Sequence, residues 1–383
     1  MRLTILFSAP VKWAAALCLT AALAIGAIAA RKPASPAPSP VVSLSAGKAQ
    51  IQSAGPLAFG PDGILFVGDS MGGAVVALDT DDRTPATSSP KIDIKGINQK
   101  AAALLGTAPD QILINDVKVN PISKNVYLSV SRGRGPNGAA VILRVDAAGK
   151  MSQLALDNIK HSAVNLADAP DPKAPANAFG RTPRTQTITD MAFVNGKLIV
   201  AGLSNEEWSS ALRSIPFPFT QVEKGATVQI WHASHGDFET EAPVRTFVPY
   251  TLQGQSYILA AYTCTPLVKI PVSDLKPGAQ VKGTTIADLG SGNSPLDMVP
   301  YRKDGHDYIL VANTSFGLVR VKADRIETYP AITSPTTMDV GGVPSERLAQ
   351  YKDVVHLTQL DEANAVILTG ASGQQNLQTI ALP

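Results

Sequence analysis

The chain has 383 residues, of which 45% are hydrophobic and 17% are charged. This content is ample for a large core, and 30 glycines with 29 prolines predict frequent turns. The formal net charge is only +2, so we expect no broad basic surface for nucleic acid or for an anionic membrane.

The first 30 residues are typical of an export signal. Arg2 and Lys12 precede an apolar run at residues 13–30, and the Ala-Ile-Ala at residues 27–29 fits a small-residue cleavage pattern. We therefore expect a signal peptide at residues 1–30 and a periplasmic or extracellular protein. Because the apolar run is close to the lower limit for a membrane span, an uncleaved anchor is the alternative.

Residues 31–40, RKPASPAPSP, form an expected linker, because a Pro/Ala-rich composition favours an extended chain without a packed core. Residues 41–383 then form the folded part. Cys18 lies inside the predicted signal, so cleavage leaves Cys264 as the sole cysteine. No intramolecular disulfide is expected after cleavage.

Short strands in groups dominate the chain after residue 50. The clearest group covers residues 294–322, with strands at 296–301, 308–313 and 317–321. Similar groups lie at residues 55–80, 114–146, 188–231, 245–289 and 354–382. Residues 91–95 alternate as a fourth strand of the first group, and the segments 98–105 and 345–351 have a helical pattern.

The groups recur at intervals of 50 to 74 residues when one hydrophobic position in each is aligned. These positions are Leu57, Val117, Met191, Val248, Met298 and Val355. Repeats of three or four strands at this length predict an all-β fold, a six-bladed β-propeller. A seventh blade is less favoured, because residues 157–187 are rich in Pro, Asp and Ala and read as a loop.

The last group supplies only three clear strands, whereas residues 41–51 have no blade of their own. We therefore expect this N-terminal strand to complete the last blade, because closure of that kind removes exposed sheet edges.

This pattern resembles the six-bladed propellers of the NHL-repeat, TolB-like and gluconolactonase-like group. The resemblance rests on Gly-Pro-Asp-Gly at residues 60–63, on the strand at 64–67 and on the repeated strand order. In the gluconolactonase-like family, a Glu, Asn and Asp set holds a divalent metal at one mouth of the channel. Asp297 with Asn205 or Asn313 offers matching types, but no Glu occupies a matching strand start.

Three groups share an Asp followed by Val or Met, at Asp116, Asp190 and Asp297. Equivalent positions on different blades converge on the propeller axis, where three carboxylates repel unless a cation or donors compensate them. These residues are the candidate metal ligands, and oxygen ligands of this type suit Ca²⁺ or Mg²⁺. The alternative is that each Asp accepts hydrogen bonds from backbone N–H groups of a neighbouring strand.

The links at the same mouth carry the candidate ligand-binding residues. These residues are Arg132, Arg134, Asn205, Trp208, Cys264 and Asn313. Arg181 and Arg184 in the preceding long loop suit a carboxylate or phosphate, although ordinary solvated loop charges are the alternative. The apparent insertion at residues 204–225 carries aromatic residues that form either a lid or partner surface, or packing onto the adjacent blade.

No complete catalytic motif is present, so whether the protein is an enzyme stays open. We expect a binding or interaction protein that presents loops at one mouth to an unidentified protein or small-molecule ligand. The alternative is a divalent-metal-dependent lactonase or esterase at the axial carboxylates. A redox propeller with a quinone cofactor has only the location of the site in its favour. Contact with a membrane is expected only through an uncleaved signal.

Overall fold

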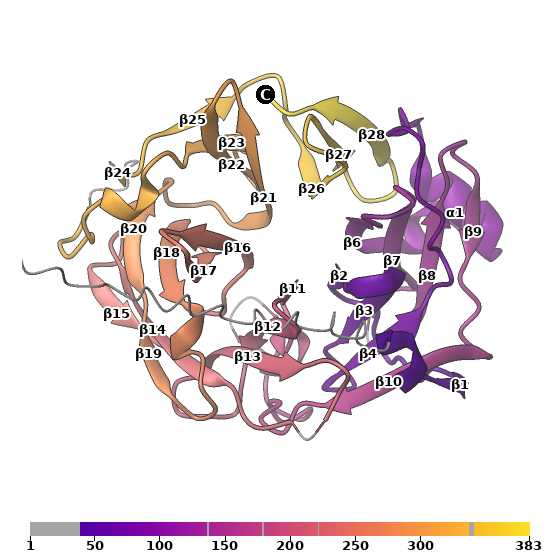
Figure 1. The fold of residues 1–383 in the computed structure, drawn as a ribbon, viewed down its shortest axis with the longest axis horizontal. Helices are drawn as coiled ribbons and strands as arrows, with labels where there is room; N and C mark the ends of the chain where they lie inside the picture. The colour runs from indigo at the N-terminus through magenta and orange to yellow at the C-terminus, as the bar shows by residue number, and fades with distance from the viewer. Residues whose placement is uncertain (1–38, 136–137, 178–179, 221, 337–340) are drawn as a thin grey trace, which may run out of the picture. The chain divides into compact units, whose positions relative to one another are not determined.

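The computed structural model describes residues 39–383 except 136–137, 178–179, 221 and 337–340. The predicted signal peptide and the predicted linker up to residue 38 lie outside these residues. Within the described part, six sheets surround a common axis as the blades of a β-propeller (Figure 1). This arrangement confirms the all-β class and the six blades. Among the described helices, none has the length and apolar character needed to cross a bilayer.

The blades are numbered in chain order, but around the axis blade one lies between blades two and three, and blade two lies beside blade six (Figure 1). Blade one contains β2 (Leu57–Phe59), β3 (Ile64–Asp69) and β4 (Ala74–Asp79), and blade two contains β6 (Ile112–Val119), β7 (Val126–Arg132), β8 (Ala139–Val145) and β9 (Met151–Gln153). Blade three contains β11 (Asp190–Val194), β12 (Lys197–Leu203), β13 (Ser210–Pro216), β14 (Ala226–His232) and β15 (Asp237–Glu239). Blade four contains β16 (Thr246–Leu252), β17 (Gln255–Ala261), β18 (Pro266–Pro271) and β20 (Thr284–Asp288).

Blade five contains β21 (Pro295–Lys303), β22 (His306–Asn313), β23 (Gly317–Lys322) and β25 (Ser345–Leu348), and blade six contains β26 (Val354–Gln359), β27 (Asn364–Thr369) and β28 (Asn376–Ala381). The outer positions are filled by β1 (Ser45–Gly47), β5 (Asp93–Ile94), β10 (Ile159–Asn165), β19 (Gln280–Lys282) and β24 (Gly341–Gly342). The helices are α1 (Ile97–Leu105) and the short 3-10 turns η1 (Pro40–Ser43), η2 (Pro61–Gly63), η3 (Pro109–Gln111), η5 (Pro183–Gln186), η6 (Val272–Asp274) and η7 (Ile326–Thr328).

Each blade is covered on both faces by its neighbours, which explains why the middle strands are apolar almost throughout. Every residue of β3 is buried, for example, and one core cluster joins Leu259 of blade four to Ile309 and Val319 of blade five. The three strands predicted within residues 294–322 are observed as β21, β22 and β23. Stacking of this kind lets every repeat bury a face that it cannot bury alone.

The closure of the ring differs from the prediction. The expectation that residues 41–51 complete the last blade is wrong, because β1 pairs with β10 at the outer edge of blade one. Blade six instead takes its fourth strand from β5, where Ile94 pairs with Leu377. The alternation of residues 91–95 predicted a strand correctly but assigned it to the wrong blade, because alternation gives no information about the pairing partner.

Three local predictions also change. Residues 159–165, read as part of a loop, form β10 and pair with β4. The apparent insertion at residues 204–225 contains β13, the third strand of blade three. The predicted helix at residues 345–351 is largely β25. In contrast, the helical pattern at residues 98–105 matches α1.

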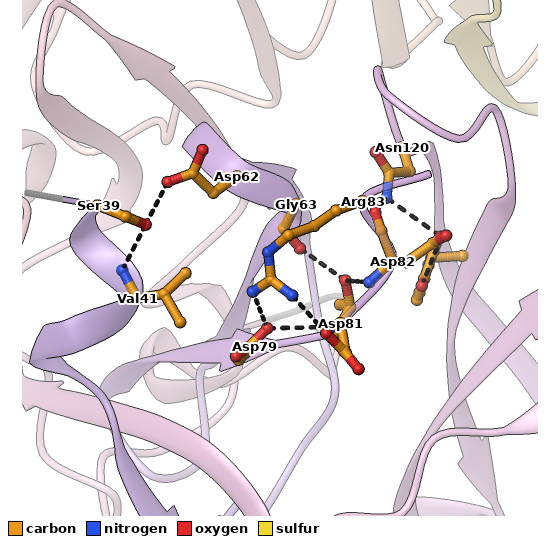
Figure 2. Close-up of polar contacts among 11 residues, drawn as sticks. Ser39, Val41, Asp62, Gly63, Asp79, Asp81, Asp82, Arg83 and Asn120 are labelled. Atoms are coloured by element: carbon orange, nitrogen blue, oxygen red, sulfur yellow. Dashed lines mark hydrogen bonds and ion pairs between the residues drawn. The ribbon is translucent and has the colours of Figure 1, made fainter. Parts of the chain in front are cut away.

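Polar contacts join the end of blade one to blade two. Figure 2 shows Arg83 between Asp79 and Asp81, and Asn120 bonded to Asp82. The buried Asp82 carboxylate also accepts a hydrogen bond of 2.9 Å from the Tyr127 hydroxyl. These contacts fasten the segment that follows β4 to the β6–β7 turn and to β7 of blade two.

Candidate functional site

The predicted aspartate trio does converge on the axis. Asp116, Asp190 and Asp297 lie on β6, β11 and β21, the innermost strands of blades two, three and five (Figure 1). The ladder shifts register immediately before Asp116 and before Asp297. A bulge of this kind re-aims the side chain that follows it, which turns these carboxylates toward the channel.

Each aspartate also accepts a backbone hydrogen bond from the innermost strand of an adjacent blade. The donors are Leu57 N to Asp116 at 2.7 Å, Phe247 N to Asp190 at 2.8 Å and Leu357 N to Asp297 at 3.0 Å. The trio therefore ties the blades together in pairs, one with two, three with four and five with six. This geometry agrees with the local bonding alternative raised by the sequence.

Two basic side chains lie among the carboxylates. Lys118 Nζ is 3.4 Å from Asp297 Oδ1 and 3.6 Å from Asp116 Oδ1. His356 Nδ1 is 3.0 Å from Asp297 Oδ2. We call Asp116, Lys118, Asp190, Asp297 and His356 the axial cluster. Its positive members compensate much of the repulsion among the three carboxylates.

Burial and charge shift the pKa values of the axial cluster in opposite directions. Burial raises the pKa of Asp190 to about 6 and also raises the pKa of Asp116. Burial opposes ionisation of Asp297 too, but Lys118 and His356 outweigh it and lower the pKa of Asp297. The hydrogen bond to Asp297 overcomes the opposing effect of burial and raises the pKa of His356.

The sequence did not identify Lys118 or His356 as part of this site. Lys118 follows Asp116 by two residues on β6, and that spacing puts both side chains on the same face of a strand. His356 follows a register shift in β26 just as Asp297 does in β21. The bulge was invisible in the sequence, so Val355 was aligned where the structure places Leu357.

The axial cavity is small and is lined by Lys118, Asp190 and Thr246 among others, with a volume of about 180 Å³. Donor atoms of Asp116, Asp297 and His356 lie within 4.8 Å of one another. Lys118 already approaches both of these carboxylates, and Ca²⁺ usually takes 6–8 oxygen ligands. The metal role of Asp116, Asp190 and Asp297 stays a prediction.

The predicted ligand residues are spread over the mouth. Arg132 and Arg134 donate to the carbonyl oxygens of Leu105 and Asp110, and Arg134 also donates to the Ser372 hydroxyl. These bonds connect the link of blade two to α1, to η3 and to blade six. Both arginines therefore have structural partners, and their role in binding stays a prediction.

The other four predicted ligand residues are not gathered into one pocket. Asn313 is buried, and its side chain bonds to Asn293 and to the Val311 carbonyl. Asn205 is exposed, whereas Trp208 and Cys264 are partly buried. Cys264 lies in the link between β17 and β18, and its ligand-binding role is likewise untested.

The aromatic residues after β13 pack down onto the sheets. Phe217 lies 4.9 Å from Phe66 and 5.0 Å from Phe219 between ring centroids. Both rings belong to the core between blades one and three. Of the two alternatives left open by the sequence, packing onto the neighbouring blades therefore describes Phe217 and Phe219.

A pocket of about 850 Å³ opens at the mouth between blades three and four. Its wall includes Asn177, Arg181 and Gln186 from the long loop before blade three. Ser209 and Thr263, from the links between the second and third strands of these blades, also line it, as do the acidic residues Glu239 and Glu241. The size lies within the usual range of small-molecule sites, about 300–1,000 Å³.

Two guanidinium groups near this pocket have no ion-pair partner in the described part of the chain. Arg181 lines the pocket and is exposed. The Nε atom of Arg245, at the link into blade four, is buried and makes no hydrogen bond with any described residue. Burial, followed by the charge of Arg181, lowers the pKa of Arg245. Arg184, predicted alongside Arg181, instead donates to the carbonyls of Met71 and Pro170.

A buried ion pair fixes the loop that forms this wall. Arg213 Nε lies 2.6 Å from Asp168 Oδ1, and their side chains are 1% and 2% exposed. Asp168 also accepts hydrogen bonds from Gly225 N through its carboxylate and from Asn205 N through its carbonyl. The sequence favours residues 157–187 and 204–226 as the loops that face a partner or ligand, and these contacts fasten the two segments to one another.

Comparison with known proteins shows no matching family model and no matching curated sequence. Among solved structures, a glucose dehydrogenase-type oxidoreductase from Thermus thermophilus is 12% identical over 88% of this chain and all of its own, with a TM-score of 0.32. A streptogramin B lyase is 9% identical, covering 88% and 97% of the two chains, with a TM-score of 0.32. A PQQ-bound aldose sugar dehydrogenase from Streptomyces coelicolor is 12% identical, with the same coverage and a TM-score of 0.27. Similarity at this level says nothing about chemistry.

Proposed function

We propose that this chain is an exported binding protein that holds a small anionic ligand in the mouth pocket between blades three and four. The observation that carries the proposal is Arg181 in the pocket wall with the guanidinium of Arg245 near it, neither with an ion-pair partner in the described part of the chain. Planar guanidinium groups recognise carboxylate and phosphate through paired hydrogen bonds. An anion between them would relieve their mutual repulsion.

The rigidity of the pocket supports the same function. The Asp168–Arg213 pair is buried, and Arg213 also donates to the carbonyls of Thr187 and Leu203. Both walls are therefore held in place before a ligand arrives, which lowers the entropic cost of binding. A second cavity of about 780 Å³ lies near β1 and β8, but there the charges of Lys48 and Asp157 pair with each other.

The alternative, a metal-dependent lactonase or esterase at the axis, is not favoured. The axial cavity of about 180 Å³ is smaller than the usual range of ligand sites. Lys118 already lies between Asp116 and Asp297, where a metal would be needed. The same cavity size disfavours an axial quinone cofactor.

The test is a thermal-shift screen with phosphate, malonate, succinate, citrate and a sugar phosphate, followed by calorimetry on each anion that raises Tm. A ligand at 100 times its Kd stabilises the folded state by about 2.7 kcal/mol, which raises Tm by several degrees. Arg181→Ala and Arg245→Ala should each weaken binding by about tenfold or more, because each removes one charged donor.

Arg302→Ala is the matched control, because Arg302 is an exposed arginine near the end of β21, in blade five. It should leave binding unchanged. The proposal fails if no anion raises Tm, or if Arg181→Ala and Arg245→Ala bind the active anion as well as the wild type does.

A further inference from the structure

A second group of metal-ligand side chains lies away from the axis, at the outer part of blades three and four. His232 ends β14, His235 follows in the turn to β15, and Cys264 lies in the β17–β18 link. Ligand atoms of these three residues all lie within 4.8 Å of one another. We call His232, His235, Cys264 and Glu239 the His–Cys cluster.

The two imidazole rings share one carboxylate. Glu239 Oε1 lies 2.5 Å from His235 Nδ1, and Glu239 Oε2 lies 2.8 Å from His232 Nδ1. The contact with His232 does not have the geometry of a hydrogen bond. Burial opposes ionisation of Glu239, but its contacts with both histidines lower its pKa. A carboxylate on Nδ1 is the usual partner of a histidine that binds metal through Nε2.

The second, independent observation is a buried ring nitrogen with nothing to bond. His232 is 2% exposed, yet its Nε2 atom has no hydrogen-bond partner among the described residues. Asp288 is 1% exposed, and its Oδ2 atom likewise has no described partner. A buried polar atom without a partner destabilises the folded state, so a fold rarely keeps one without another use for it.

The backbone at the third ligand is also held in an uncommon conformation. Cys264 has φ +61° and Thr265 has φ +60°, the left-handed region that disfavours residues with a Cβ. Hydrogen bonds from Cys264 N to Asn293 O and from the Thr265 hydroxyl to Gly290 O maintain this turn. Residues held in this way commonly lie at functional sites.

We propose that His232, His235 and Cys264 form a binding site for a zinc-class transition-metal ion. Imidazole nitrogen and thiolate sulfur are the ligands that Zn²⁺ prefers, with bond lengths of about 2.0–2.3 Å. Tetrahedral geometry then separates the donor atoms by about 3.4–3.7 Å, so donor atoms that all lie within 4.8 Å of one another have to approach by at most about 1 Å. His235 is 51% exposed and precedes Gly236, which leaves it room to move.

Three protein ligands leave the fourth position of a tetrahedral ion open for water or for another ligand. Glu239 and Thr263 line the 850 Å³ mouth pocket, so an ion held here would border that pocket. The metal proposal does not depend on the anion proposal, because none of the three ligands is a pocket arginine.

The experiment uses the full chain with Cys18→Ser, in which Cys264 is the only thiol. After chelation and reduction, the protein is titrated with Zn²⁺ and, as a spectroscopic substitute, with Co²⁺. We expect one equivalent of Zn²⁺ per chain, a higher Tm with Zn²⁺, and a near-ultraviolet charge-transfer band from a Co²⁺–thiolate bond. Binding of an ion to the folded state alone produces the rise in Tm.

Ligand variants decide which residues hold the ion. Cys264→Ser should abolish the charge-transfer band and weaken Zn²⁺ binding by about 100-fold, and His235→Ala should weaken it by about tenfold or more. Glu239→Gln should weaken it by about 10–100-fold, since it perturbs only the orientation of the rings. Circular dichroism checks that each variant is folded.

His306→Ala is the matched control, because His306 is 53% exposed and its Nδ1 lies 2.7 Å from Asp324. It resembles His235 in exposure and in its carboxylate partner. Among the described residues, however, His306 belongs to no group of metal-ligand side chains. The proposal is overturned if the protein binds no Zn²⁺ at micromolar concentration. It is also overturned if Cys264→Ser and His235→Ala keep wild-type affinity, which would point to the axial histidine instead.

Discussion

The axial cluster and the His–Cys cluster both combine acidic side chains with histidine, but they differ in whether their polar atoms have bonding partners. At the axis, each carboxylate has a backbone donor, and Lys118 and His356 add positive charge. In the His–Cys cluster, the buried Nε2 atom of His232 has no described partner and the backbone at Cys264 is in a disfavoured region. The first cluster stabilises the ring of blades, whereas the second leaves ligand atoms available.

The difference follows from where each cluster lies in the repeat. Asp116, Asp190 and Asp297 occupy corresponding positions, so one way of bonding to an adjacent blade is used three times. The His–Cys cluster lies where blades depart from the repeat. Where the third strand begins, blades one and five have Gly73 and Gly317 in the left-handed conformation, whereas blade four has Thr265 after Cys264.

The largest effect that separates the two clusters is expected for Asp297→Ala. This change removes the acceptor for Leu357 N and the partner of His356. It also removes one of the two carboxylates that pair with Lys118. Loss of one partner from a buried ionic network costs about 3–5 kcal/mol. Urea denaturation should show this loss in the free energy of unfolding.

Asp157→Ala is the control, because the Asp157 side chain is 88% exposed and its pair with Lys48 is at the surface. Such pairs contribute at most about 1 kcal/mol. If Asp297→Ala costs no more than Asp157→Ala, the axial cluster is not the structural connection described above.

A smaller, pH-dependent effect is expected at Asp190. Burial raises its pKa from the ordinary 3.8 to about 6, so the folded state binds the proton more tightly than the unfolded state does. This contribution to stability is complete below pH 3.8 and is lost as the pH rises through about 6. At about 1.36 kcal/mol per pKa unit, the total is about 3 kcal/mol.

Asp190→Asn removes this titration and keeps an oxygen for Phe247 N. Between pH 4 and pH 7, the unfolding free energy of the variant should therefore gain on that of the wild type by up to about 3 kcal/mol. The difference between the two proteins isolates Asp190 from Asp116, Asp297, Lys118 and His356, which also titrate. A difference that is constant with pH would show that Asp190 is not the strained carboxylate of the axis.

Much of the fold could be predicted because the strands alternate and the turns carry strong local signals. The hairpin of β21 and β22 and the Pro-Asp-Gly turn of η2 are read directly from adjacent residues. The convergence of the aspartates followed from repeat spacing alone. In both cases the information lies within one blade or in the repeat period.

What could not be predicted depends on contacts between distant segments. The pairing of β5 with β28 joins residues almost 300 positions apart, and the pattern of residues 91–95 does not indicate which strand they pair with. His356 was missed because a bulge shifts β26, and bulges leave little trace in one sequence. His232 and Cys264 meet because β14 of blade three packs beside blade four, where it contacts β20, the neighbour of β18. A linear sequence does not show that proximity.

The smallest expected effect tests whether Cys264 contributes to stability at all. Cys264 has φ +61°, so glycine at this position removes the steric conflict of the Cβ atom. Glycine also gives the unfolded chain more conformational entropy, which offsets part of this gain. The net gain in the free energy of unfolding is about 0.5–1 kcal/mol. Cys264→Gly should therefore raise the free energy of unfolding in metal-free buffer, whereas Cys264→Ser, which keeps the Cβ, should change it by less than about 0.5 kcal/mol. A loss of more than about 1 kcal/mol in Cys264→Gly would mean that the thiol packs as a structural side chain. The His–Cys cluster would then resemble the axial cluster, in which the side chains serve the fold.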